Sequence, residues 1–246
     1  MLRPGPTTRS KIRAAVGRAL LVLAACTAAM PWHPAQAASA LAAAKFADLR
    51  GESASAEVRH IADWAVHSGD HAGLPFVVVD KVDSRVFVFD AQGRLRGASP
   101  ALVGAARGDE SPPDIGSRPI SSIRPSERTT PAGRFQAVMG KGPKGEDILW
   151  VDYDSALALH RVVTHVPQER RLQRLQSQEP AERRITYGCI NVPVAFYEAV
   201  VRPLFQQTRG IVYILPEARR TQDLFGSYEV RDAGLRNAAS TMPVAH

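Results

Sequence analysis

Short runs of β-branched and aromatic residues, separated by polar turns, occupy the middle of this chain and predict a strand-rich domain. Two of these runs flank a polar turn within residues 76–89 and predict a β-hairpin, and a third strand is expected within 94–103. Later runs predict strands over 135–139, 148–151, 156–163 and 210–215. The regular part of the domain is therefore expected to be built mainly from strands.

Two segments carry apolar residues at helical rather than alternating spacing. Residues 38–73 are rich in Ala, and we expect one or two short helices there, ahead of the main domain. Residues 193–205 repeat apolar positions every three or four residues, and Pro193 suits a first helical turn. The predicted fold class is mainly β with α, with short N-terminal helices.

Three segments lack a periodic pattern. Residues 104–128 are rich in Gly, Pro, Ser, Asp and Arg, and two interpretations stay open: a surface loop that borders a cleft, or a disordered connection. Residues 167–184 predict a polar, Arg-rich and partly helical insertion. Residues 218–246 form a polar tail with little to bury, so partial disorder is expected there.

The N-terminus carries five basic residues and no acidic one, followed by a short apolar run and a small-residue sequence ending at Ala37. This order predicts a secretory signal peptide over 1–37 and export to the periplasm or cell envelope. A competing interpretation takes Leu23-Ala24-Ala25-Cys26 as a lipoprotein box, with a lipid on Cys26, and an uncleaved anchor is the third. Under the first two interpretations, contact with the membrane comes only through the leader or that lipid.

The charge changes once the leader is set aside. The whole chain has a formal net charge of +7, and removal of the five basic leader residues leaves +2. A nucleic-acid-binding protein would keep a surplus of Lys and Arg, so no nucleic-acid partner is predicted. The rest divides into a helical N-terminal extension (38–73), one main domain (74–217) and the polar tail, and we expect a monomer.

Removal of the leader also leaves Cys189 as the only cysteine. A thiol without a disulfide partner is either a buried small apolar residue or a nucleophile. Gly188 lets the backbone approach a substrate closely, and the helix expected after Pro193 would present its positive N-terminal end nearby. If Cys189 is a nucleophile, we expect it to be partly ionised to the thiolate.

His160 is the best candidate base, because it ends an otherwise apolar strand. The alternative is a structural histidine, and His165 is the rival base, five residues further along. A single Cys/His pair without close spacing does not define a zinc site. No metal and no cofactor is predicted.

Three pieces of sequence, in order, resemble the L,D-transpeptidase catalytic domain of the YkuD family. They are the turn Thr130-Pro131-Ala132-Gly133-Arg134-Phe135, the pair Leu159-His160, and Thr186-Tyr187-Gly188-Cys189-Ile190-Asn191. The resemblance covers about 76–216. It implies a β-sandwich or barrel-like catalytic fold for 74–217, and a transferase of peptidoglycan synthesis, cell wall biogenesis and cell shape.

The resemblance also implies roles for individual residues. Cys189 would attack a peptidoglycan stem peptide and form a thioester, with His160 as general base and the main-chain carbonyl of Arg161 orienting the imidazole. Backbone N–H groups around Tyr187, Gly188 and Cys189 would stabilise the oxyanion, and Thr186 and Asn191 would shape the loop that holds them. Asn191 and Arg184 are the candidate substrate-binding residues.

Two departures from the family pattern put the substrate in doubt. Tyr187 stands where the family usually has histidine, and the insertion 167–184 lengthens the span between His160 and Cys189. That insertion is either a lid or anion site, with Arg170, Arg171, Arg183 and Arg184 as candidates, or a solvated charged helix. Two alternatives to a transpeptidase stay open: an L,D-carboxypeptidase or other cell-wall amide hydrolase using the same site, and a wall-binding module without turnover.

Overall fold

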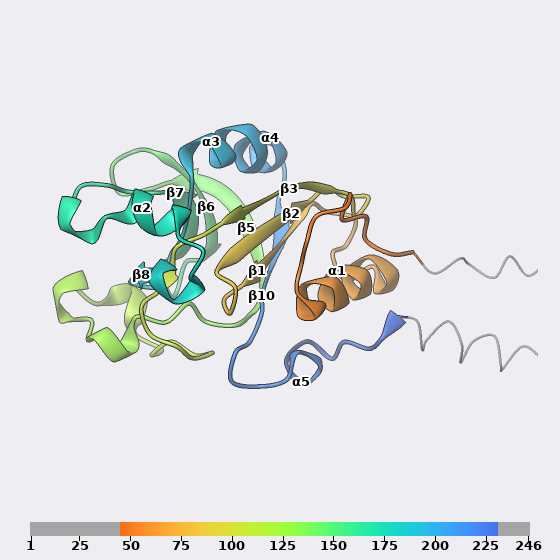
Figure 1. The fold of residues 1–246 in the computed structure, drawn as a ribbon, viewed down its shortest axis with the longest axis horizontal. Helices are drawn as coiled ribbons and strands as arrows, with labels where there is room; N and C mark the ends of the chain where they lie inside the picture. The colour runs from red at the N-terminus through yellow and green to blue at the C-terminus, as the bar shows by residue number, and fades with distance from the viewer. Residues whose placement is uncertain (1–44, 231–246) are drawn as a thin grey trace, which may run out of the picture. The chain divides into compact units, whose positions relative to one another are not determined.

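The computed structural model describes residues 45–230 and is built around one eight-stranded sheet (Figure 1). The strand order is β3-β2-β1-β10-β5-β6-β7-β9. In chain order the sheet comprises β1 (Phe76–Asp80), β2 (Arg85–Phe89), β3 (Leu95–Pro100), β5 (Gly133–Lys141), β6 (Asp147–Asp152), β7 (Leu157–Arg161), β9 (Ile190–Val192) and β10 (Gly210–Ile214). The predicted hairpin and the later strands are confirmed, with boundaries shifted by a few residues.

The sheet curls until its two edges nearly meet. Leu102, just beyond edge strand β3, exchanges both main-chain hydrogen bonds with Asn191 of edge strand β9, at 2.8 and 2.9 Å. A two-stranded sheet of β4 (Val103–Gly104) and β8 (Arg184–Thr186) extends the same contact. The predicted mainly β class, with a barrel-like sheet and a few helices, is therefore confirmed.

The strands next to the hairpin turn are buried on both faces, which explains their continuous apolar runs. In β1, Val77 and Val79 face one hydrophobic cluster, while Phe76 and Val78 face a second one. Residues 194–205 cover the first cluster as α3 (Val194–Phe196), a π-helical turn (Tyr197–Val201) and α4 (Arg202–Phe205). The helix predicted after Pro193 is confirmed.

Helix α1 (Ala56–Ser68) covers the second cluster and is the helix found in the described part of the predicted extension. The Ser55 side chain accepts a hydrogen bond from the Val58 amide at its start, and Gly69 ends it in a left-handed conformation. Its buried face includes Ile61 and Trp64. The extension is thus packed on the sheet as part of the same core.

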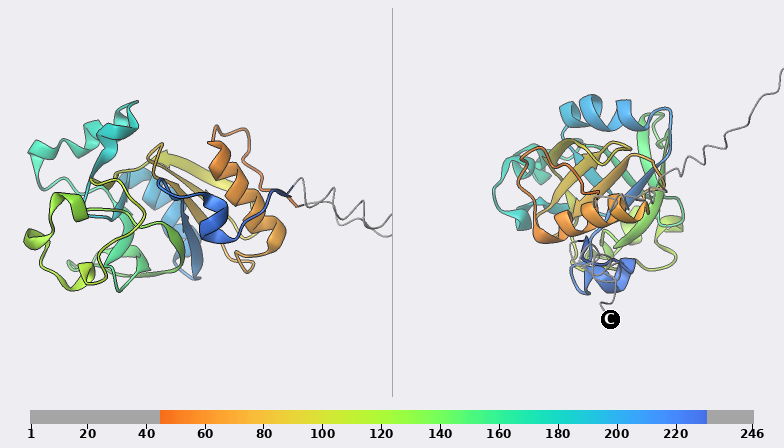
Figure 2. Two further views of the ribbon diagram at one scale, coloured as in Figure 1. Left: turned by 90° about the horizontal axis from the view of Figure 1, so that it is seen from below. Right: turned by 90° about the vertical axis from the view of Figure 1, so that its right-hand side faces the viewer.

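The part of the polar tail that the structure describes, residues 218–230, packs against the rest of the domain. It forms α5 (Thr221–Phe225), and Phe225 makes an edge contact with Tyr213 of β10. Ser227 and Tyr228 are hydrogen-bonded to two histidines of α1, at 2.8 and 2.9 Å. Figure 2 shows α5 beside α1. These partners lie about 160 residues away in sequence, so composition alone gave no sign of them.

Residues 104–128 form a surface loop with three single turns of 3-10 helix (115–117, 120–122 and 125–127), so of the two interpretations the ordered loop is the one observed. The Arg118 guanidinium donates to both Glu127 carboxylate oxygens, at 3.1 and 2.9 Å. A Cβ added at Gly116 would lie 2.2 Å from the carbonyl oxygen of Asp154, so this loop is seated against the turn before β7.

The insertion 167–184 is partly helical, as predicted. It contains α2 (Arg171–Gln176) between two 3-10 turns, at 167–169 and 180–183. The predicted signal peptide, the lipoprotein box with Cys26 and the end of the tail lie outside the described residues. Within residues 45–230 there is no helix of the length and apolar character needed to cross a membrane.

Candidate active site

Cys189 lies in a tight loop between β8 and β9 that side-chain hydroxyls hold in place. The Thr186 hydroxyl donates to the Cys189 carbonyl at 2.7 Å and accepts from the Gly188 amide at 3.2 Å. The Thr130 hydroxyl donates to the Gly188 carbonyl at 2.6 Å. Gly188 itself has a φ of +136°, and a Cβ there would lie 2.9 Å from the Thr129 carbonyl oxygen. Glycine is required here both for conformation and for space.

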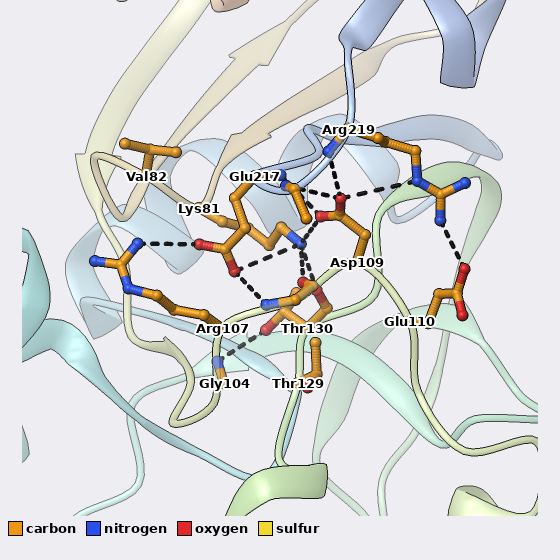
Figure 3. Close-up of polar contacts among 12 residues, drawn as sticks. Lys81, Val82, Gly104, Arg107, Asp109, Glu110, Thr129, Thr130, Glu217 and Arg219 are labelled. Atoms are coloured by element: carbon orange, nitrogen blue, oxygen red, sulfur yellow. Dashed lines mark hydrogen bonds and ion pairs between the residues drawn. The ribbon is translucent and has the colours of Figure 1, made fainter.

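A buried ion network anchors the turn that carries Thr130 (Figure 3). The Lys81 ammonium, 1% exposed, donates to the Thr130 carbonyl at 3.0 Å and to the Asp109 carboxylate at 2.9 Å. The Asp109 carboxylate also accepts main-chain hydrogen bonds from residues 217–219. Three segments far apart in sequence therefore meet behind the Cys189 loop.

His160 is positioned by the strand next to the cysteine. Strands β7 and β9 are parallel neighbours with His160 opposite Asn191, which is two residues after Cys189. The His160 Nδ1 lies 2.7 Å from the Arg161 carbonyl oxygen. A carbonyl can only accept, so Nδ1 carries the proton and Nε2 presents its lone pair. This is the carbonyl that the resemblance implied.

The thiol and the imidazole are not hydrogen-bonded to each other. The Cys189 Sγ donates to the Ala156 carbonyl at 3.5 Å, and the His160 Nε2 accepts from the Asn191 side-chain amide at 3.1 Å. Ala156 has a left-handed φ of +52°, in the turn that ends at β7. The thiol and the imidazole are therefore each hydrogen-bonded to a third group, and not to each other as proton transfer between them would require.

Loss of solvent shifts the pKa of both groups toward the neutral form. Loss of solvent raises the pKa of the Cys189 thiol, and main-chain hydrogen bonding at Ala158 offsets this only in part. Burial, together with the nearby Arg171 charge, lowers the pKa of His160. The expectation of a partly ionised thiol is wrong for this resting state. The helix end expected to favour thiolate lies beyond β9, roughly 10 Å or more along the extended chain.

Cys189 forms part of the wall of a cavity of about 270 Å³. The 104–128 loop supplies the outer wall, in which Ile115 and Ile123 are buried and Ile120 is 64% exposed at the rim. Tyr187 also lines the cavity, and its ring lies 4.1 Å from the Arg128 guanidinium carbon, in cation–π contact. The residue that departs from the family pattern is thus a wall residue next to the thiol.

The two predicted substrate-binding residues have structural roles in the resting protein. The Arg184 side chain is buried, forms an ion pair with Glu217, and also donates to main-chain carbonyls, among them that of Lys81. Asn191 is 1% exposed, and its side chain lies between His160 and Arg171. Neither side chain lines the cavity, and the polar atoms of both are hydrogen-bonded to other parts of the protein.

The other candidates from the sequence are spread out. His165 is exposed and lies 2.8 Å from the Lys144 ammonium, with no contact to Cys189. Arg170 is exposed, whereas Arg183 is buried and donates to two main-chain carbonyls. Sequence reasoning missed the specific role of Arg171, because nothing in a polar helix with several arginines marks the one that turns inward.

Within the described part of the chain, no group of three or more His, Cys, Asp or Glu side chains is arranged to hold a metal ion. The arrangement instead provides a thiol in a cavity and a neutral imidazole on the adjacent strand. Those two groups are sufficient in kind for nucleophilic acyl transfer. They also require a rearrangement before the proton can pass between them.

Comparisons with known proteins give structural similarity only. No protein-family model matches this sequence, and no curated protein matches it. The catalytic domain of the L,D-transpeptidase from E. faecium aligns with 57% of this chain and 96% of its own, at 14% identity and a TM-score of 0.31. The L,D-transpeptidase LdtMt1, solved in complex with imipenem, aligns with 57% of this chain and 58% of its own, at 15% identity and a TM-score of 0.32. Similarity at this level carries no functional conclusion.

Proposed function

We propose that this protein is a cysteine acyltransferase that acts on peptidoglycan stem peptides, an L,D-transpeptidase. The observation that carries the proposal is the placement of a thiol in a cavity wall, one strand away from an imidazole that donates its Nδ1 proton to a backbone carbonyl. The motif residues that resemble the YkuD family are the same residues that build this arrangement. A wall-binding module would need neither the fixed tautomer nor the glycine-dependent loop.

In the proposed reaction, His160 Nε2 takes the thiol proton as Cys189 Sγ attacks the carbonyl carbon of a diaminopimelate residue in the donor stem. The Cys189 main-chain N–H stabilises the oxyanion, since the Gly188 N–H is already bonded to Thr186. Collapse of the tetrahedral intermediate breaks the amide bond and expels D-alanine, which takes the proton from His160. An amine of a second stem then attacks the thioester and releases Cys189.

A neutral resting thiol resists oxidation between substrates, because the thiolate is the form that oxidants attack. A protonated thiol that donates to the Ala156 carbonyl is a poor nucleophile, because the thiolate is the reactive form. Substrate entry would displace the thiol from that carbonyl and bring it toward the imidazole. Ionisation would then be coupled to binding, as general-base catalysis requires.

We further propose that the protein is exported as a monomer, with residues 1–37 as a cleaved signal peptide. The supporting observation is the order of basic, apolar and small residues in the leader. Intact mass of the protein from its native envelope tests this. A mass that begins at Ala38 supports cleavage, whereas a lipid-modified mass beginning at Cys26 favours the lipoprotein interpretation.

The test of function is incubation of the folded protein with disaccharide tetrapeptide muropeptides, followed by mass spectrometry. Cross-linked dimers with loss of D-alanine are expected. Trimmed monomers would favour the carboxypeptidase, in which water resolves the thioester. No change, with a wild-type-like fold and bound muropeptide, would favour the binding module. The Cys189→Ala variant is the control for each product.

A further inference from the structure

Arg171, on the insertion helix α2, reaches back to the catalytic strands. Its guanidinium donates from Nη1 to the Asn191 Oδ1 at 2.8 Å, and its Nε pairs with the Glu169 carboxylate. The Arg171 side chain is 13% exposed. No other arginine of residues 167–184 touches Asn191. The insertion therefore contributes one cation directly behind the proposed base.

The donor and acceptor rules fix the direction of the whole chain of hydrogen bonds. A guanidinium only donates, so the Asn191 side-chain oxygen must face Arg171. The Asn191 amide nitrogen then faces His160, and its N–H requires a lone pair on Nε2 at 3.1 Å. The proton of the imidazole consequently lies on Nδ1, where the Arg161 carbonyl accepts it. Arg171 sets the orientation of the Asn191 amide, and that amide and the Arg161 carbonyl favour the same tautomer from opposite sides of the ring.

The consequence is that Asn191 occupies the ring nitrogen that must receive the thiol proton. The imidazole can accept a proton at Nε2 only if the amide moves away or turns over to present Oδ1. Turning over breaks the bond from Arg171 to Oδ1 and sets an amide N–H against the guanidinium. The other charged groups near the ring are Arg161, on its own strand, and Glu146, before β6. Neither of their side chains is hydrogen-bonded to Asn191.

We propose that Arg171 is a positioning residue that acts through Asn191 to hold His160 as the Nδ1–H tautomer with Nε2 blocked. It thereby prevents Nε2 of His160 from accepting a proton until the Asn191 amide turns over. This inference rests on the proposed role of His160 as base. Its test reads the imidazole directly and needs no turnover, so its failure and a failure of the proposed function are separate outcomes.

The experiment is nitrogen-15 NMR of the histidine ring nitrogens across pH, with His160 assigned by its loss in His160→Gln. Four full-length proteins are compared: wild type, Arg171→Met, Arg171→Lys and Arg170→Met. Methionine cannot donate, whereas lysine can, and Arg170 is an exposed neighbour that makes no side-chain hydrogen bond among the described residues. Its substitution removes the same charge without touching Asn191.

In wild type, the His160 signals are expected to report the Nδ1–H tautomer. Arg171→Met should convert them to a mixture with the Nε2–H tautomer, Arg171→Lys should restore the wild-type pattern, and Arg170→Met should leave it unchanged. In an Asn191→Ala background, Arg171→Met should no longer change the tautomer. A wild-type tautomer in Arg171→Met, or an equal change in the Asn191→Ala background, would overturn the proposal.

A second variant keeps the test independent of how well Arg171→Met folds. Asn191→Asp presents only acceptor oxygens, so it should place a proton on Nε2 while Arg171 stays intact. If Asn191→Asp folds and His160 still shows an unprotonated Nε2 with Nδ1–H at neutral pH, side-chain orientation at 191 does not control the imidazole and the inference is wrong.

Discussion

His160 lies on β7 and Cys189 lies in the loop just before the parallel neighbour β9, yet each side chain is hydrogen-bonded elsewhere, the imidazole to Asn191 and the thiol to the Ala156 carbonyl. Strand pairing brings the two residues together. The Asn191 side chain and the Ala156 main-chain carbonyl then hold the two groups apart.

Replacement of Cys189 by Ser should abolish acyl-enzyme formation, because a serine hydroxyl beside a neutral imidazole in this site is far less nucleophilic than a thiol. The expected loss of turnover is at least about 10³-fold. Intact mass after incubation with muropeptide detects the adduct in wild type. Circular dichroism should show an unchanged fold, and a fully active serine variant would contradict the thioester mechanism.

His160→Ala should reduce turnover by about 10²- to 10⁴-fold, since it removes the proposed general base. His165→Ala is the matched control, because that ring is exposed and contacts Lys144 instead. Rates of muropeptide dimer formation measure both. A large loss in His165→Ala with little effect of His160→Ala would reverse the assignment.

Alkylation of Cys189 by iodoacetamide should be slow at neutral pH and should rise with pH through a pKa above the usual thiol value. The reason is that burial raises the pKa of the Cys189 thiol, and only the thiolate reacts. A stopped-time alkylation series from pH 6 to pH 10, read by mass spectrometry, measures the profile. A rate that is already on its plateau at pH 7 would mean that the resting thiol is ionised.

The fold should lose stability in acid partly through His160. Burial lowers the pKa of His160 in the folded state, below about 6.5 for a free imidazole. Its contribution is therefore fully present above that value, and it is lost as the pH falls through the folded pKa, because the unfolded chain takes up a proton first. Urea unfolding at pH 7 and pH 5 should show a smaller loss for His160→Gln than for wild type. An equal loss in both proteins would count against a buried neutral imidazole.

Thr130→Val should lower turnover while preserving the overall fold, because it removes the hydroxyl that donates to the Gly188 carbonyl at 2.6 Å. Loss of this buried hydrogen bond should cost about 1–3 kcal/mol of unfolding free energy. The control is Thr129→Val, since the Thr129 hydroxyl makes no hydrogen bond within residues 45–230. Urea denaturation measures the unfolding free energy of the two variants, and the rate of muropeptide dimer formation measures their turnover. If both substitutions had similar effects, the hydrogen bond from Thr130 to the Gly188 carbonyl would not be what stabilises the Cys189 loop.

Gly188→Ala should destabilise the Cys189 loop, since it adds a Cβ 2.9 Å from the Thr129 carbonyl oxygen at a φ of +136°. Backbone strain of this kind costs about 1–3 kcal/mol, and the clash adds to it. Gly51→Ala is the matched control, with a φ of +80° and nothing within 4 Å of the added Cβ. Gly188→Ala should have a lower unfolding temperature and a lower turnover than Gly51→Ala. Equal values for the two variants would show that the Cys189 loop can relax around the added Cβ.

Much of the fold could be predicted from the sequence, because it depends on local patterns. The hairpin over 76–89 follows from two β-branched runs and a turn, and the helix after Pro193 follows from its apolar spacing. The Cys189 loop and the strand-end position of His160 were likewise visible in consecutive residues. Each of these signals lies within about fifteen residues of the chain, where periodicity and turn chemistry are decisive.

Only the tertiary structure decided the state of the site. The packing of the tail on α1, the burial of Arg184 against Glu217 and the contact of Arg171 with Asn191 all join segments distant in sequence. The raised pKa of the Cys189 thiol also depends on tertiary structure, because it is set by how much solvent the surrounding loops exclude. The sequence by itself determined which residues are able to do the chemistry. Long-range contacts determined which of their atoms are free to do it, because a polar atom that is already hydrogen-bonded in the interior must break that bond first.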